Sequence, residues 1–125
     1  MHRTLLALFG LILILSPLCP PALAHHGNAA YDETTPVTMK GTVTQFGWVN
    51  PHVQIFLDVK DDKDAVTHWV VESFSPEKLS RSGWTKDSLK PGDQVTVTIS
   101  AAKNGSPSGF LRKLVFEDGR ELLSR

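Results

Sequence analysis

The feature that most constrains this fold is a strict alternation of residue types after the dipeptide Asn50-Pro51. Apolar side chains fall at every second position: Val53, Ile55, Leu57 and Val59 alternate with His52, Gln54, Phe56 and Asp58. This period of two is typical of a β-strand with one buried face. Proline has a fixed φ and no N–H donor, so the Asn-Pro pair predicts a bend before the strand. We therefore expect a sheet protein with His52 at a strand start, beside a bend.

Four further stretches have strand character, and a short helix is predicted among them. The five predicted strands are residues 37–48, 52–60, 66–74, 95–101 and 110–117. Ser75 can cap a helix whose first position is Pro76, and Gly83 can end it. The order of three strands, one helix and two strands is that of the OB-fold, a small five-stranded barrel. We predict this mainly β architecture, with another small β-sandwich or barrel as the alternative.

Two details of the barrel are also predicted from glycines. Gly41 and Gly47 interrupt the first strand, which favours bulges or sharp coiling there. Asp118-Gly119 is a turn signal, after which we expect only a short tail. The loop at residues 104–109, rich in glycine and serine, separates the fourth and fifth strands.

The N-terminal residues have the three parts of a secretory signal peptide. Arg3 supplies a positive start, residues 5–15 are apolar, and Ala22-Leu23-Ala24 is an A-x-A cleavage site. The apolar run is shorter than the roughly 20 residues that span a bilayer, so a retained anchor is the less favoured alternative. We predict a periplasmic protein with residues 1–24 as a signal peptide cleaved after Ala24, residues 25–36 as an N-terminal arm and residues 37–125 as the barrel domain.

Charge and cysteine content exclude several classes of function. The single cysteine, Cys19, falls in the predicted signal peptide, so the mature chain has no thiolate ligand and no disulfide. The formal net charge is +0, and the chain has no basic cluster of the kind that binds nucleic acid. A cysteine nucleophile, a G-x-S-x-G elbow and a phosphate-binding glycine loop are all absent from the sequence. We expect a protein that is not an enzyme, with a hydrolase acting through His52 or Glu72 as the least supported class.

The histidines point to a different chemistry. Cleavage after Ala24 makes His25 the first residue, so a free α-amine and an imidazole can chelate one metal ion together. Nitrogen ligands of this kind suit Cu(II) and, less selectively, zinc. His26 adds a second imidazole next to it. This resembles the N-terminal arrangement of copper proteins with a histidine brace, although the likeness covers His25 alone and needs a partner in space.

Strand pairing indicates which residues can supply that partner. The turn at residues 61–64 pairs the second strand with the third, which puts His52 near Glu72 or Phe74 and Asp58 near His68. The two histidines then lie about 20 Å apart along the ladder, so they cannot share one ion. We prefer a site of His25, His26 and His52, with Glu72 as a ligand or orienting group, over one of His68 and Asp58.

Aromatic residues around the bend suggest a second kind of site. Trp48 and Phe56, with Asn50 at the bend, can form a surface on which a small ligand stacks, and Phe56 falls on the polar face of its strand. The same residues can serve a non-enzymatic interaction module that recognises a peptide, a glycan or a periplasmic partner protein. This is the alternative to metal binding, and the two differ in whether Phe56 or the histidines carry the function.

Several short motifs together resemble a known family. They are His25-His26-Gly27, Gly41-Thr42-Val43, Trp48-Val49-Asn50-Pro51-His52, His68-Trp69-Val70-Val71-Glu72, Ser75-Pro76, Gly83-Trp84, Lys90-Pro91-Gly92-Asp93 and Asp118-Gly119-Arg120-Glu121. The chain resembles a family of small exported bacterial proteins known only as a domain of unknown function, and the likeness covers the whole predicted mature chain. It implies a periplasmic location and brings no established activity.

Overall fold

A computed structural model describes residues 27–125 of the chain. Within these residues the elements are η1, a 3₁₀ helix (Gly27–Ala30), β1 (Val37–Gly47), β2 (Gln54–Lys60), β3 (Val66–Glu72), α1 (Pro76–Ser80), β4 (Gln94–Ala101), β5 (Ser108–Phe116) and β6 (Glu121–Leu123). In this part of the chain, no helix has the length and apolar character needed to cross a bilayer. The predicted signal peptide, His25 and His26 lie outside the described residues.

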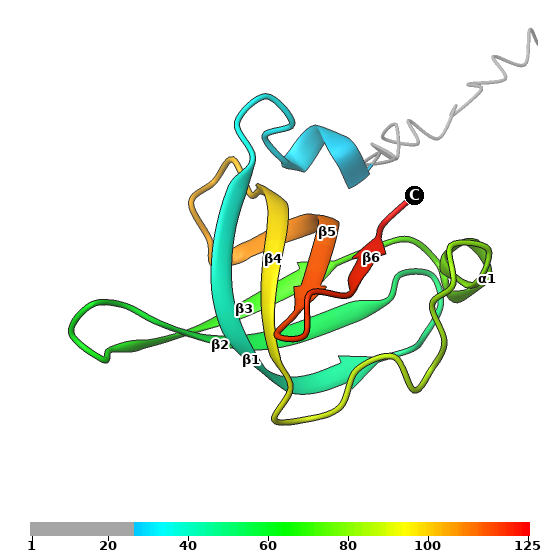
Figure 1. Cartoon of the computed structure of the whole chain (residues 1–125). Helices are drawn as coiled ribbons and strands as arrows, with labels where there is room; N and C mark the ends of the chain where they lie inside the picture. The colour runs from blue at the N-terminus through cyan, green and yellow to red at the C-terminus, as the bar shows by residue number, and fades with distance from the viewer. Residues whose placement is uncertain (1–26) are drawn as a thin grey trace, which may run out of the picture.

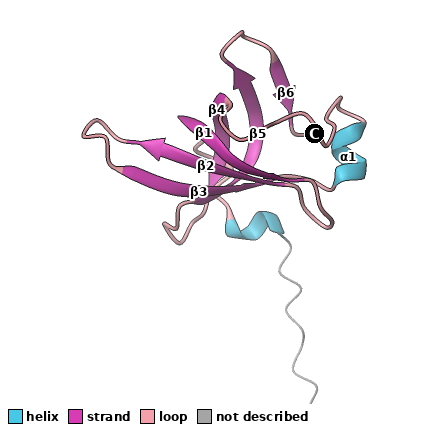
Figure 2. Ribbon diagram, turned by 90° about the horizontal axis from the view of Figure 1, so that it is seen from below, coloured by secondary structure: helices cyan, strands magenta, loops and turns pink. Residues whose placement is uncertain are grey.

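The first five strands form a closed barrel (Figure 1). Their order in the sheet is β3-β2-β1-β4-β5, and a parallel pairing between β3 and β5 closes the ring. The other pairings in the ring are antiparallel, and α1 lies between β3 and β4 in the chain. This is the OB-like topology predicted from the sequence, and the prediction is confirmed. The β2–β3 hairpin extends beyond the barrel in both views (Figures 1 and 2).

The core is made by the inward phase of the alternating strands. Val53, Ile55 and Leu57 are all buried, as the alternation predicted, whereas Val59, the fourth apolar position, is only partly buried. They pack in one cluster with residues from the other strands and from the α1 region, namely Val43, Val71, Leu79, Trp84, Leu89, Val95, Val97, Ile99, Leu111 and Leu114. Burying a side chain of this size contributes about 1.5–3 kcal/mol to stability, so the cluster is the main force that holds the barrel.

β1 is long enough to pair with two neighbours in succession. Its first half pairs with β4 and its second half with β2. The bulge that redirects the strand lies between Val43 and Gln45, not at Gly41 or Gly47 as predicted. Gly41 has a different role, because a Cβ there would lie 3.1 Å from the carbonyl oxygen of Asp58. Gly41 therefore allows β2 to pack closely against β1, and it does not mark the bulge.

The short helix begins as its sequence predicted. The side chain of Ser75 accepts a hydrogen bond from the backbone N–H of Lys78, and Pro76 occupies the first helical position. After the helix, Trp84 is buried, and its Nε1–H donates to the carbonyl oxygen of Leu123 at 3.0 Å. The helix and the C-terminal residues therefore close the same part of the barrel.

The predicted C-terminal tail is a sixth strand, which corrects the sequence reading. β6 pairs with β5 after the Asp118-Gly119 turn, where Gly119 has a φ of 87°. The turn signal was read correctly, but the three residues that follow are too few to show an alternation. β5 also begins before the predicted start at residue 110, since Ser108 and Gly109 pair with β3.

The described part of the N-terminal arm is attached to the barrel. Tyr31 forms a bridge with Ala102, and the N–H of Asp32 donates to the carbonyl oxygen of Ala101. The N–H of Lys103 donates to the carbonyl oxygen of Ala30. These bonds hold η1 and Tyr31 against the end of β4, where Figure 1 shows η1 in blue above the barrel.

Candidate functional site

The strand register brings His52 to Glu72. Gln54 pairs with Glu72 at the start of β2, and two further backbone bonds continue the pairing: Val53 N–H to the Phe74 oxygen and Ser73 N–H to the Val53 oxygen. His52 precedes this point, just after the bend, where the Asn50-Pro51 peptide bond is cis. Its Nδ1 lies 3.7 Å from Oε2 of Glu72. The expectation that these side chains are neighbours is confirmed, although β2 begins at Gln54 and not at His52.

A third residue, Tyr31, joins this pair from the N-terminal arm. Its hydroxyl donates a hydrogen bond to the same oxygen of Glu72, Oε2, at 3.1 Å. Burial, and then the charge of Glu72 and this hydrogen bond, raise the pKa of Tyr31 to about 12. The phenol therefore stays protonated near neutral pH and keeps donating to the carboxylate. Sequence analysis missed Tyr31, and its only signal was that it is the sole tyrosine, placed in a polar arm.

The spacing of His52 and Glu72 leaves room for an ion between them. Two ligands that each lie about 2.0–2.2 Å from one metal ion are separated by roughly 3–4 Å, depending on the angle between them. The 3.7 Å between Nδ1 and Oε2 falls in that range and is too long for a direct hydrogen bond. Both side chains are partly exposed, at 44% for His52 and 31% for Glu72, so solvent and ions can reach them.

The other histidine-carboxylate pair has a different geometry. Asp58 and His68 are paired in the β2–β3 ladder, as predicted. Nδ1 of His68 lies only 2.6 Å from Oδ1 of Asp58, which is a direct hydrogen bond. The His68 side chain is 84% exposed on the projecting hairpin. These two groups satisfy each other, so this pair is a surface contact with no gap for an ion.

Residues 27–125 alone do not complete a metal site. Within this range, no three histidine, cysteine, aspartate or glutamate side chains converge on one point. His52 and Glu72 provide two potential ligands, and the predicted ligands His25 and His26 lie outside the described residues. The described chain begins at Gly27, directly after His26.

The structure does not bring the predicted stacking residues together. Trp48 packs against the core cluster, with its ring 5.9 Å from that of Phe46. Phe56 alternates with the buried Ile55 and Leu57, so it points away from that core. Asn50 is exposed at the bend. Trp48 thus packs on the core cluster and Phe56 faces away from it, so the two rings do not form one platform.

The fold and this cluster define a class: a small OB-like β-barrel that carries a tyrosine, a histidine and a glutamate where its N-terminal arm meets the barrel. The chain belongs to the Family of unknown function (DUF6152), whose model matches residues 14–112. This confirms the resemblance to a family of unknown function. A comparison with curated proteins finds no match to the chain. The matched range contains the arm and every residue of the cluster.

Proposed function

We propose that this protein is a periplasmic, non-enzymatic binding protein for a divalent metal ion, copper first and zinc second. The ligands are the N-terminal His25, with His26, and the pair of His52 and Glu72. The observation that carries the proposal is the 3.7 Å gap between Nδ1 of His52 and Oε2 of Glu72, beside the point where the N-terminal arm attaches.

The arm is long enough for its histidines to reach this pair. Tyr31, which contacts Glu72 directly, is only five residues after His26 and six after His25. Residues 27–30 form η1, which rises about 2.0 Å per residue, and the remaining steps can extend by about 3.3–3.6 Å each, so His25 can lie up to roughly 15 Å along the chain from Tyr31. A terminal amine and imidazole on His25 therefore lie within chain reach of the gap.

Tyr31 has a supporting role in this proposal. Groups that hydrogen-bond a metal ligand orient it, and their loss typically weakens metal affinity by about 10–100-fold. Tyr31 binds one carboxylate oxygen of Glu72 and also ties the arm to the barrel through its bridge with Ala102. One residue thus orients a ligand and positions the segment that brings the other ligands.

The test is calorimetric titration of Cu(II) into mature protein whose N-terminal His25 has been confirmed by mass spectrometry. We expect one ion per chain, bound more tightly than by a free His-His-Gly peptide. His52→Ala and Glu72→Gln should each weaken binding by roughly tenfold or more. The matched control is His68→Ala, which removes the histidine of the other pair and should leave the affinity unchanged.

Two further variants separate the N-terminal chelate from the barrel. Adding one glycine before His25 preserves every side chain but moves the α-amine, so binding should fall sharply. An affinity equal to that of the free peptide, unaffected by His52→Ala, would refute the site. The alternative function, recognition of a peptide, glycan or periplasmic partner through a barrel face, instead requires Phe56 and is unaffected by these changes.

A further inference from the structure

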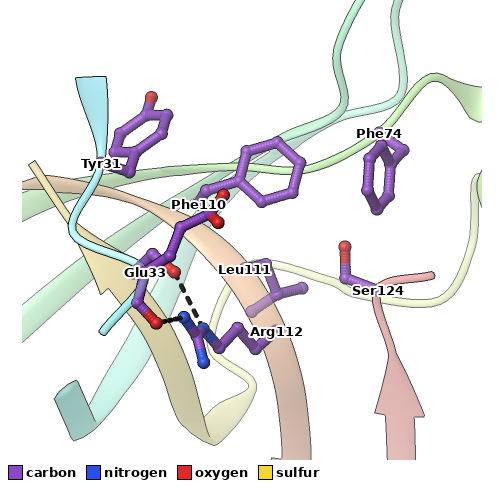
Figure 3. Close-up of a pocket in the computed structure, with 8 residues that line it drawn as sticks. Tyr31, Glu33, Phe74, Phe110, Leu111, Arg112 and Ser124 are labelled. Atoms are coloured by element: carbon purple, nitrogen blue, oxygen red, sulfur yellow. Dashed lines mark hydrogen bonds between the residues drawn. The ribbon is translucent and has the colours of Figure 1, made fainter. Parts of the chain in front are cut away.

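A pocket lies next to the histidine-glutamate pair and shares Tyr31 with it, while His52 and Glu72 themselves are not among its lining residues (Figure 3). Its volume is about 310 Å³, and its lining residues are Tyr31, Glu33, Phe74, Ser100, Phe110, Leu111, Arg112 and Ser124. A water molecule occupies about 30 Å³ in the liquid, so the pocket holds on the order of ten water-sized groups. This is the size of a molecule with one ring and one polar group.

One wall of the pocket is aromatic. The rings of Phe74 and Phe110 meet edge to face, with centroids 4.9 Å apart, and the ring of Tyr31 is 6.0 Å from that of Phe110. Figure 3 shows the three rings in a row, with the Arg112 side chain below Phe110 in this view. Rings that are already packed against each other present a rigid apolar surface to a ligand.

Arg112 gives the same pocket a fixed positive charge. Nε of Arg112 donates to the hydroxyl of Ser100 at 2.8 Å, and Nη2 donates to the backbone oxygen of Glu33. These bonds use two of the five N–H donors of the guanidinium and fix its plane. Among residues 27–125, no carboxylate lies within ion-pair distance of Arg112. The charge is therefore held in place without an acidic partner.

From this combination we infer that the pocket binds a small carboxylate with an aromatic or flat apolar body, its carboxylate on Arg112 and its ring against Phe74 and Phe110. A planar guanidinium fork matches a carboxylate in a bidentate geometry. Ligand pockets commonly pair an apolar lining with a few fixed polar groups of this kind. Glu33 lines the same pocket, and its negative charge disfavours an anion. Removing the charge of Arg112 and removing that of Glu33 should therefore have opposite effects on the binding of a carboxylate.

The test uses three probes of the same shape: benzoate, neutral benzamide and cationic benzamidine. Each is titrated into ¹⁵N-labelled metal-free protein while amide chemical shifts are followed, so the result does not depend on the metal site. We expect benzoate to bind roughly tenfold more tightly than benzamide, with benzamidine weakest, because a charge-assisted bond is lost in each case. The shifted amides should be those of residues 31–33, 110–112 and 124.

Two variants with opposite effects complete the experiment. Arg112→Gln should weaken benzoate roughly tenfold or more, while Glu33→Gln, which keeps the backbone oxygen that Arg112 uses, should leave it unchanged or tighter. If Arg112→Gln does not fold, comparing the affinities of the three probes for the unaltered protein still tests the assignment. Equal affinity for benzoate and benzamidine, absent benzoate binding up to its solubility limit, or benzoate shifts elsewhere on the barrel would each overturn the assignment.

Discussion

Closure of the barrel depends on a glycine that has no space for a side chain. Gly109 pairs with Val71 of β3 on one side and with Ala101 of β4 on the other. A Cβ at this position would lie 2.9 Å from the backbone oxygen of Ser100 and 2.5 Å from Cδ1 of Ile99. The end of Ile99 can rotate away, but the Ser100 oxygen belongs to β4 and moves only with the strand. We therefore expect Gly109→Ala to strain the β3–β5 closure.

The size of this effect follows from the costs of overpacking. Forcing one extra carbon into a packed interior typically costs about 1–3 kcal/mol. Urea unfolding of small domains has an m-value of about 1–3 kcal/mol/M, so a cost near 2 kcal/mol lowers the midpoint by roughly 1–2 M. Urea titration followed by tryptophan fluorescence measures this directly. The same variant should weaken benzoate binding, because the strained residue precedes Phe110.

Gly47→Ala is the matched control for this prediction. Gly47 also lies in a strand, but the nearest atom to an added Cβ is the Gln54 oxygen at 3.6 Å, which is an ordinary contact. Replacing a glycine by alanine where the side chain fits stabilises a folded protein by about 0.4–1 kcal/mol, because the unfolded chain has less conformational entropy. The two substitutions should therefore have opposite signs. A Gly109→Ala protein as stable as the original, with the same m-value, would show that the closure is not tight.

Three further predictions concern single side chains. In metal-free protein, absorbance titration of Tyr31, the sole tyrosine, should give a midpoint near 12. Because the pKa of Tyr31 is raised in the folded protein, the stabilisation from this residue is fully present below about pH 10 and is lost as the pH rises through about 12. A midpoint near 10 would contradict the burial of Tyr31 and its contact with the carboxylate. Trp84→Phe leaves the carbonyl oxygen of Leu123 unpaired, so urea unfolding should show a loss of about 1–3 kcal/mol; no loss would mean that water replaces the indole. Ser75→Ala should cost about 0.5–2 kcal/mol in thermal unfolding while Ser75→Asp retains the cap, and equal stability of the two variants would argue against capping.

Much of the fold was predictable because its signals are local. Alternation in residues 53–59 correctly separates the buried Val53, Ile55 and Leu57 from their partly exposed neighbours. Ser75 and Pro76 start the helix as their local preferences predict. Each of these features depends on residues that are close together in the chain, so a single sequence contains the necessary information.

The errors in the sequence reading fall where strand identity depends on a distant partner. Ser108 and Gly109 have the composition of a loop, yet they close the barrel because β3 lies alongside them. β6 is too short to have a pattern of its own and exists as a strand through its pairing with β5. The bulge in β1 lies where the strand changes partner, between Val43 and Gln45. Of the two glycines used to predict it, Gly41 permits close approach of β2, whereas Gly47 has room for a side chain.

In the candidate site, too, some features could be predicted from the sequence and others depend on the tertiary structure. Parity in a hairpin limits which side chains are neighbours, so the sequence alone placed His68 near Asp58 and His52 near Glu72 or Phe74. Only the tertiary structure decided that the first pair has a gap of 3.7 Å and the second a direct bond of 2.6 Å. Those distances depend on the bend and on side-chain conformation, which strand periodicity does not specify.

The contacts made by Tyr31 and Arg112 were decided entirely by the tertiary structure. Tyr31 reaches Glu72 across 41 residues, and Arg112 reaches the backbone of Glu33 across 79. No local pattern encodes such pairs, because their members are far apart in the sequence and only the complete fold brings them together. The sequence by itself therefore determined the existence of the five barrel strands, the helix start and the hairpin register. The tertiary structure placed the N-terminal arm beside the histidine-glutamate pair, and the pocket formed between the arm and the barrel.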